Sequence, residues 1–395
     1  MLPSAQKPST FGIDGRRQEE TLLSFRYLDD GMPAGELTPL QKRFARQVAH
    51  KLSTGQYALE HVPCAVCGGQ ELSLLAAKDR YGLPVSTQIC RTCGLIQTNP
   101  RMDQAAYQEF YNQEYRPLYE GALQPTPRAL ELQYARGRAL RDYVRRFLLR
   151  PPEQTWILEV GCGAGGVIQA FREVGFQVQG IDLGADYVEY GRSHWGLDLR
   201  VATVHDVEPE PRPHIVLYSH VAEHLLDIRA EFRRVRRLLA PDGLLVVETP
   251  GLYHLPVVYQ GDFLRYLQNA HTYTFSLRTL RNILEPLGFQ LLSGTEMVRA
   301  VFVPVDVPSG SGFTSDYARA RAFLQEMELQ HLLVEGWRRL VASPMEAAQY
   351  LARVTEAFPR SYLAHHLLAL ALERADRRKR ARQIRARARR LIPAR

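Results

Sequence analysis

A glycine-rich turn is the first stretch of the chain whose residue types could bind a ligand. The segment WILEVGCGAGG, residues 156–166, begins with an apolar run that contains one acid, Glu159. Such a run, bounded by turn residues and followed by helical spacing, is typical of a buried strand in a parallel sheet. The turn itself contains Gly161, Cys162, Gly163 and Gly165. Glycines allow tight-turn backbone angles and let a ligand approach bare backbone, although such a turn can also be purely structural.

An acid at the end of the next predicted strand makes this turn more specific. The strand Gln177–Ile181 is followed directly by Asp182, about twenty residues after the glycine turn. A carboxylate in that position can accept hydrogen bonds from both hydroxyls of an adenosine ribose. The succession of strand, glycine turn, helix, strand and acid therefore predicts an adenosine-binding site.

Four of the five cysteines form two C-x-x-C pairs, Cys64 with Cys67 and Cys90 with Cys93. Twenty-two residues separate the pairs, and strand-like patches lie between them. Two such knuckles can hold four thiolates around one zinc ion, and four protein ligands leave no open position for catalysis. We therefore expect a structural zinc ion, and we assign Cys162 only a place as a small residue in the turn.

The elements that must position these residues alternate between strand and helix. Five further strands are predicted in the segments LRVATV, HIVLYSH, GLLVVETP, GFQLLSG and MVRAVFV, between residues 199 and 303. Strands that alternate with helices indicate a mostly parallel, doubly wound α/β sheet, and the last two, which lack a helix between them, should pair antiparallel. The long excursion Gly251–Ser276 leaves the carboxyl end of the fifth strand, the edge at which such sheets bind ligands.

Four regions are predicted along the chain. Residues 1–60 form an N-terminal extension, loosely ordered except for one helix, Thr38–Leu52, which has Thr38 as its N-cap. Residues 61–125 form the zinc-binding module and an aromatic linker, in which Tyr115 could close over a cofactor. Residues 126–306 form the α/β domain, and residues 307–395 form a helical C-terminal extension with a basic tail.

The segment LEVGCGAGG, together with Asp182 and the seven strands, resembles class I S-adenosylmethionine-dependent methyltransferases. The order CxxC, CxxCGL, an FY–Y segment, LEVGCGAGG and EH–L–D resembles those with an N-terminal zinc-binding domain, which include C-methyltransferases of nucleotide-linked deoxysugars. The resemblance covers about residues 60–305. It implies a seven-stranded, Rossmann-like methyltransferase sheet and S-adenosylmethionine as the cofactor.

The same resemblance implies which residues surround the cofactor. The glycine turn would cradle the methionine moiety, Asp182 would bind the ribose, Asp206 and Val207 would lie by the adenine, and Ser219 and His220 would line the site. The full set of candidate cofactor-binding residues is Glu159, Gly161, Cys162, Gly163, Gly165, Asp182, Leu183, Asp206, Val207, Ser219 and His220.

Catalysis would require a base if the acceptor is a hydroxyl group or an activated carbon. In the family, an EH pair in the excursion carries the catalytic histidine; here the stretch AHTYTFS keeps His271 and has Ala270 in place of the acid. His271 is thus the first candidate base, and its alternative role is to pack the excursion on the sheet. His224 with Glu223 is the second candidate, and Tyr273, His254 and Tyr259 are candidates for the wall of the acceptor site.

Charge is unevenly distributed along the chain. Residues 373–395 carry a net charge of +9, whereas the whole chain carries +8, so the rest is almost neutral. High basicity is therefore a property of the tail, and it argues against a basic nucleic-acid face on the body. The chain has no apolar run of membrane-spanning length and no signal-type N-terminus, so we expect a cytoplasmic protein.

Three functions remain open from the sequence. The first is methylation, at carbon or oxygen, of a small hydroxylated acceptor such as a sugar, a nucleotide sugar or a glycan component. The second is an RNA or other nucleic-acid methyltransferase that uses the zinc module and the basic tail. The third is a non-catalytic interaction protein that retains the fold, and in any of them the C-terminal helices could bind a protein partner.

Overall fold

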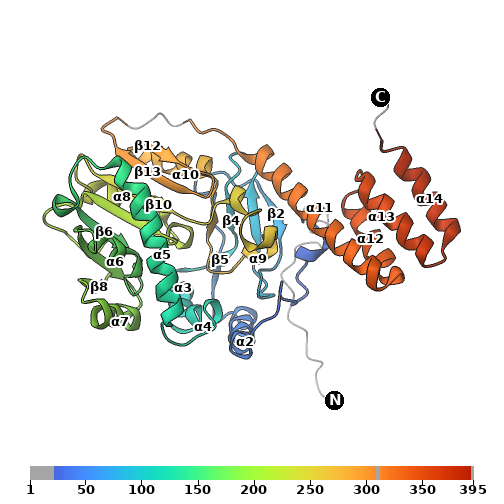
Figure 1. The fold of residues 1–395 in the computed structure, drawn as a ribbon, viewed down its shortest axis with the longest axis horizontal. Coiled ribbons are helices and arrows are strands. Elements are labelled where there is room, and N and C mark those ends of the chain that lie inside the picture. Colours follow the sequence, from blue (N-terminus) through green and yellow to red (C-terminus); the bar gives the residue numbers. More distant parts are fainter. Residues whose placement is uncertain (1–21, 308–311, 393–395) are drawn as a thin grey trace, which may run out of the picture.

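A seven-stranded sheet is the largest sheet of the computed structural model, which describes residues 22–307 and 312–392, and it lies toward the end of the molecule opposite the C-terminal helices (Figure 1). Its strand order is β12-β13-β10-β9-β6-β7-β8. The strands are β6 (Trp156–Val160), β7 (Gln177–Asp182), β8 (Leu199–Val201), β9 (Ile215–Ser219), β10 (Leu244–Glu248), β12 (Phe289–Gly294) and β13 (Arg299–Pro304). The Rossmann-like sheet predicted from the sequence is confirmed.

Strands β6 to β10 run parallel, and β13 pairs antiparallel with both β10 and β12. The predicted antiparallel pairing of the last two strands is therefore confirmed. The chain proceeds from β6 outward to β7 and β8 and then returns to the other side of β6 with β9. Open parallel sheets bind ligands at the carboxyl edge of such a switch in strand order, so the loops after β6, β7 and β9 are the expected location of a site.

Helices cover both faces of this sheet. One face packs on α5 (Pro127–Val144), α6 (Gly166–Arg172) and α7 (Ala185–Trp195), which contribute Leu140, Phe171 and Val188 to the core. The other face packs on α8 (Ile228–Leu238) and α10 (Leu277–Leu284), which contribute Phe232 and Ile283. The same core includes cysteines of the N-terminal module, so that module packs directly on the second face.

A second, four-stranded sheet has the order β11-β4-β3-β2. Strands β2 (Leu72–Ala76), β3 (Thr87–Cys90) and β4 (Ile96–Thr98) belong to the cysteine module, whereas β11 (Tyr273–Thr274) belongs to the excursion after β10. Tyr273 pairs with Gln97 and Thr274 with Ile96. The excursion thus covers the edge of β4, which would otherwise present unpaired backbone groups.

The N-terminal residues are more ordered than expected. Helix α2 (Pro39–Thr54) begins at the predicted N-cap Thr38, whose hydroxyl accepts a hydrogen bond from the Gln41 N–H in a capping box. Residues 22–35 were expected to be loosely ordered, but Leu23 and Tyr27 are buried against the excursion and the C-terminal extension. The expectation for residues 1–21 lies outside the described residues.

Short elements connect this part of the chain to the α/β domain. A 3₁₀ helix spans Phe25–Tyr27, and strands β1 (Leu59–Glu60) and β5 (Arg101–Met102) form a two-stranded sheet. Helices α3 (Gln104–Gln113) and α4 (Tyr115–Tyr119) carry the aromatic linker into α5.

Four helices form the C-terminal extension, which projects from one end of the molecule (Figure 1). They are α11 (Tyr317–Ala342), α12 (Pro344–Ala357), α13 (Tyr362–Arg374) and α14 (Arg378–Arg389). The start of α11 is tied to the cysteine module, because the Asp316 N–H donates to the Cys93 carbonyl at 2.9 Å. Among the described residues, no helix has the length and apolar composition needed to cross a membrane.

Candidate cofactor and acceptor site

The glycine turn after β6 has a backbone that only glycine accommodates well. Gly161, Gly163 and Gly165 all have positive φ, at 70°, 53° and 76°. A Cβ on Gly161 would lie 2.4 Å from Val221 Cγ2, and one on Gly165 would lie 2.6 Å from Leu197 Cδ1. A Cβ on Gly163 would meet nothing closer than 3.6 Å. The two sides of the turn are therefore closed by packing, whereas its middle is only in ordinary contact with the side chains of Gln133, Arg116 and Tyr187.

Asp182 holds this turn in place. Its Oδ2 accepts a hydrogen bond from the Gly163 N–H at 2.8 Å, and its Oδ1 accepts one from the Gly184 N–H at 2.7 Å. Each carboxylate oxygen has a further lone pair, so Asp182 can still accept hydrogen bonds from two hydroxyls. The predicted ribose acid and the predicted glycine turn are thus in direct contact.

Two buried side chains, those of Glu159 and Cys162, belong to the end of β6 and to the turn itself. Glu159 is almost completely buried, its Oε2 has no hydrogen-bond partner, and burial raises its pKa well above the ordinary value. Cys162 is also buried, and burial raises the pKa of its thiol. A thiol in this environment is inert, which fits the structural role expected for Cys162.

The other candidate cofactor residues lie at the ends of neighbouring strands. Leu183 is exposed, Val207 is buried, and Asp206 is exposed with its Oδ2 accepting a hydrogen bond from the Thr203 N–H at 2.8 Å. Ser219 is buried with an unpartnered hydroxyl, and His220 has a left-handed φ of 58°. Strain of this kind in a residue other than glycine is concentrated at functional sites, where surrounding contacts hold it.

Next to His220 lies a buried group of three titratable residues, Glu223, His224 and His271. One potential ligand or proton-transfer atom from each lies within 4.8 Å of the others. The rings of His224 and His271 are 4.9 Å apart. Both oxygens of Glu223 and Nδ1 of His271 are buried without a hydrogen-bond partner. The structure therefore brings together the first and second candidate bases, which are 47 positions apart in the chain.

Burial keeps all three groups neutral near pH 7. It raises the pKa of Glu223 to about 8, lowers that of His224 to about 3, and lowers that of His271 well below the ordinary histidine value. Nearby positive groups, including Arg80, act in the same direction on both histidines. Each neutral imidazole has one ring nitrogen without a hydrogen, which can accept a proton, and an uncharged Glu223 can donate one.

Hydrogen bonds fix the two histidines differently. Nδ1 of His224 lies 2.6 Å from Tyr111 Oη and 3.0 Å from the Ala270 carbonyl. Nε2 of His271 contacts the side-chain amide of Gln268, and the His271 carbonyl accepts a hydrogen bond from Thr98 Oγ1 at 2.8 Å. The cysteine module, through Thr98 in β4, thereby positions the backbone of the first candidate base.

Aromatic rings form one wall around this group. Tyr115 stacks on Tyr111 and on Tyr119 with ring centroids 4.5 Å and 5.6 Å apart, and it lies 5.8 Å from the His224 ring. The role of Tyr115 as a cover over the cofactor stays a prediction. Tyr259, from the excursion, is packed at 5.4 Å on Tyr266, whose ring lies 5.3 Å from that of His271.

Sequence reasoning did not identify Arg116. Its guanidinium lies 4.1 Å from the Tyr187 ring centroid, and its Nη2 would be 3.8 Å from a Cβ on Gly163. In the sequence, the only indication was its position between aromatic residues. Its contact with the glycine turn could not be predicted, because helix α4 reaches the turn only in the folded chain.

The hydrogen bonds of Tyr273 and His254 described below go to residues other than His224 and His271. The Tyr273 hydroxyl donates to the Leu226 carbonyl at 3.0 Å and lies 3.4 Å from Arg101 Nη1. His254 lies in a 3₁₀ helix, Leu252–His254, where its N–H donates to the Gly251 carbonyl. The hydroxyl of Tyr273 therefore contacts residues where the cysteine module meets the loop before α8, and not the histidine pair.

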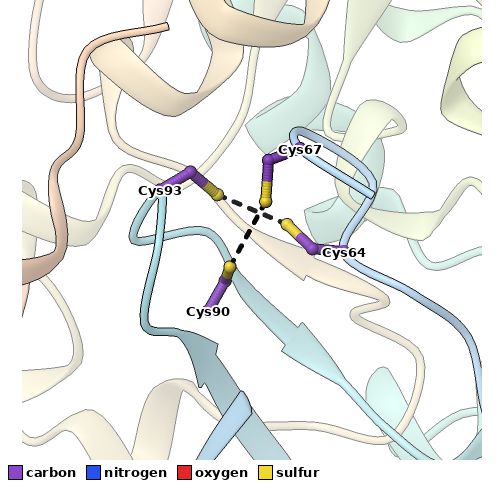
Figure 2. Close-up of side chains that lie close together, drawn as sticks. All are labelled: Cys64, Cys67, Cys90 and Cys93. Atoms are coloured by element: carbon purple, nitrogen blue, oxygen red, sulfur yellow. Dashed lines mark hydrogen bonds between the residues drawn. The ribbon is translucent and has the colours of Figure 1, made fainter. Parts of the chain in front are cut away.

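The four cysteines of the module converge on one point (Figure 2). Cys64 Sγ lies 3.3 Å from Cys93 Sγ, and Cys67 Sγ lies 3.5 Å from Cys90 Sγ. A tetrahedral zinc ion with Zn–S bonds of about 2.3 Å requires sulfurs about 3.8 Å apart, so the cluster needs only slight expansion to hold one. The donor set, four cysteines with none in a disulfide, fits zinc.

Comparisons with known proteins agree with this fold. Residues 132–293 match the family model described as a methyltransferase domain. Over 126 residues, the chain is 34% identical to a ubiquinone biosynthesis O-methyltransferase of Bradyrhizobium diazoefficiens, with 30% of this chain and 50% of that relative covered. A protein of the same name from Rhodopseudomonas palustris is 38% identical over 98 residues, covering 24% and 39% of the two chains. The chain thus spans about half the length, or less, of these curated relatives.

A solved structure of similar fold is the 1,6-didemethyltoxoflavin-N1-methyltransferase of Burkholderia thailandensis, crystallised with S-adenosylhomocysteine. It is 17% identical, has a TM-score of 0.39, and is matched over 55% of this chain and 98% of its own. The order of the seven strands and the match over residues 132–293 show that the chain contains a methyltransferase domain with the class I, Rossmann-like fold.

Proposed function

We propose that the protein transfers a methyl group from S-adenosylmethionine to a small hydroxylated acceptor, such as a sugar, a nucleotide sugar or a glycan component. The observation that carries the proposal is the juxtaposition of two features. A glycine turn held by Asp182 lies at the carboxyl edge of β6, and a buried group of two neutral histidines and a protonated glutamate lies beside it. The names of the curated relatives favour oxygen as the methylated atom.

The residues of the turn fit the proposed cofactor. Asp182 would accept the ribose hydroxyls, and the backbone of the glycine turn would lie against the methionine moiety. We infer that Arg116, which reaches the same turn, binds the methionine carboxylate. When bound, S-adenosylmethionine supplies an electrophilic methyl group. Leu183, Asp206, Val207, Ser219 and His220 would complete the pocket.

The buried group would prepare the acceptor. His271 would remove the acceptor proton, and His224 would orient the acceptor or replace His271 in that role. Alignment of the acceptor against the tyrosine wall would supply much of the rate, because a correctly oriented pair of reactants reacts many orders of magnitude faster.

The substitution His271→Ala tests the role of the base. Turnover, measured as S-adenosylhomocysteine formed with panels of nucleotide sugars and of phenolic acceptors, should be lost, and the affinity for S-adenosylmethionine should stay within a few-fold. His254→Ala is the matched control in the same excursion. Unchanged turnover in His271→Ala would remove this histidine from the mechanism.

Binding of S-adenosylmethionine to the intact protein separates the enzymatic proposal from a non-catalytic role. Saturable one-to-one binding in calorimetry is the expected result, and its absence in zinc-loaded protein would overturn the proposal. The cysteine cluster would hold a structural zinc ion in that preparation.

A nucleic-acid acceptor is the weaker alternative. The basic helix α14 lies at the end of the molecule farthest from the glycine turn (Figure 1), so it does not extend the candidate acceptor site.

A further inference from the structure

A cleft of about 850 Å³ opens on the side of the excursion that faces away from the histidine pair. Three segments far apart in the sequence form it: the N-terminal segment, the excursion and helix α11, together with Tyr350 from the middle of α12. Its lining includes Arg26, Gln260, Asp262, Arg265, Met327, Val334, Glu335, Arg338 and Arg339. The volume is in the usual range of small-molecule sites, which occur preferentially where domains meet.

The walls of the cleft are fixed by a buried ion network. Asp262 is 2% exposed and accepts a hydrogen bond from Arg26 Nη2 at 2.6 Å. Arg26 Nη1 also donates to the buried Glu328 at 2.9 Å. These contacts pair the Arg26 guanidinium with two carboxylates and join the N-terminal segment, the excursion and α11 at the rim of the cleft.

The remaining lining charges leave a positive surplus. Glu335 is shared between Arg338 at 2.6 Å and Arg339 at 2.8 Å. Arg265 lies 3.9 Å from Asp262, which Arg26 already occupies. The side chains of Arg265 and Arg338 are 42% and 71% exposed, so both guanidiniums can turn toward a ligand. Met327 and Val334 give the same cleft an apolar floor.

One wall is a strained turn shared with the candidate acceptor site. Tyr259, Gln260 and Gly261 have consecutive left-handed φ values of 52°, 58° and 69°. For residues other than glycine this conformation costs about 1–2 kcal/mol each, so surrounding contacts must hold it. Gln260 and Gly261 line the cleft, whereas the ring of Tyr259 packs on Tyr266 beside His271.

We propose that this cleft binds a small amphipathic anion, a carboxylate or a phosphate ester on an apolar body, and thereby sets the position of Tyr259. The anion docks on Arg265 and Arg338, and its apolar body lies on Met327 and Val334. The bound anion contacts Gln260 and stabilises the left-handed turn, and the turn in this conformation places Tyr259 beside the proposed acceptor site. Occupancy of the cleft is in this way coupled to the shape of the proposed acceptor site.

The binding test needs no methyl transfer and so does not depend on the proposed function. Calorimetry on the full chain, without S-adenosylmethionine, uses uridine diphosphate as the phosphate probe and benzoate as the carboxylate probe. At least one probe should bind saturably, and Arg265→Glu/Arg338→Glu should weaken it tenfold or more. Arg380→Glu, an exposed arginine of α14, is the matched control and should bind as the native protein does.

The outcomes of this test are decisive in both directions. If only one probe binds, and if its binding is lost in Arg265→Glu/Arg338→Glu, the result supports the site and identifies the anion as phosphate or carboxylate. Absence of binding by both probes up to about 10 mM, a free energy weaker than about −3 kcal/mol, overturns it. Equal binding by the double variant and the native protein also overturns it.

The coupling to Tyr259 has its own readout. With 3-fluorotyrosine placed at position 259, the fluorine NMR resonance should shift when the probe that binds in calorimetry is added. It should not shift in Arg265→Glu/Arg338→Glu. Binding without a shift would overturn the coupling. Normal affinity for S-adenosylmethionine in the double variant would show that a loss of probe binding arises from the cleft and not from damage to the cofactor site.

Discussion

Asp182 shows how much a single side chain contributes to the candidate cofactor site. Its two oxygens accept hydrogen bonds from the Gly163 and Gly184 N–H groups, and both are thus needed to shape the turn before any ligand arrives. An asparagine can supply only one accepting oxygen, and its amide would face a backbone donor.

For Asp182→Asn we therefore expect the dissociation constant for S-adenosylmethionine to rise at least about tenfold, since one unsatisfied buried donor costs about 1–3 kcal/mol. Calorimetry measures the change directly. Asp186→Asn, an exposed acid in the first turn of α7, is the control. Equal affinities for the two variants would contradict the proposed role of Asp182.

Glu223 makes a prediction about pH. Burial raises its pKa from 4.5 to about 8, so between these values the folded protein binds one proton more than the unfolded chain. Stability should therefore fall as pH rises through this window, by up to about 1.4 kcal/mol per pH unit from this group.

Glu223→Gln removes the titrating group but keeps its size. The melting temperature of the variant should depend less on pH between 5 and 8, and the variant should gain most over the native protein at pH 8. Thermal unfolding followed by circular dichroism at each pH provides the comparison. Parallel curves for the two proteins would show that Glu223 does not carry the raised pKa.

At the scale of elements, the cysteine hairpin and the excursion after β10 form one sheet. Strand β11 pairs with β4, and Thr98 of β4 holds the carbonyl of His271. A change at the cysteines should consequently reach the candidate base, although none of the cysteines contacts it.

We expect Cys90→Ser to lower the melting temperature and the zinc content, and to lower kcat more than the affinity for S-adenosylmethionine. The glycine turn belongs to the other sheet and should keep its shape. Elemental analysis should give about one zinc ion per native chain and less in the variant. Cys162→Ser, at the cysteine outside the cluster, should keep its zinc. Loss of cofactor affinity in proportion to kcat in Cys90→Ser would contradict this separation.

The sequence was informative where the signal is local. The glycine turn, the acid at the end of β7 and the cysteine pairs are short motifs, and strand–helix alternation is visible over many residues. The pairing of β11 with β4 was not predictable, because a two-residue strand has no readable periodicity and its partner is remote in the chain. Arg116 and the arginine-lined cleft were missed for the same reason: each depends on segments that only the fold brings together.

At the scale of the whole molecule, a buried carboxylate, Glu328, joins the C-terminal extension to the N-terminal segment. Glu328 accepts hydrogen bonds from the Ser24 hydroxyl at 2.6 Å and the Tyr27 hydroxyl at 3.0 Å, in addition to its ion pair with Arg26. The junction therefore depends on residues from the two ends of the chain.

Glu328→Ala should lower the free energy of unfolding by about 3–5 kcal/mol, because it leaves Arg26 buried with only part of its countercharge. Chemical denaturation measures the loss, and Glu326→Ala, an exposed acid on the same helix, should change it by less than about 0.5 kcal/mol. A small effect at Glu328 would indicate that the junction is held mainly by apolar packing.

The shared sheet also constrains how the protein is made. The cysteine hairpin leaves the ribosome long before residues 273 and 274, which complete its sheet, have been synthesised. At about 5–20 residues per second, the edge of β4 stays open for roughly 10–35 s of translation. During that interval the hairpin exposes the kind of strand edge on which chains aggregate, and early metal capture is the available means of keeping it compact. The supply of zinc during synthesis, and not only its presence in the finished protein, would then limit the yield of folded enzyme.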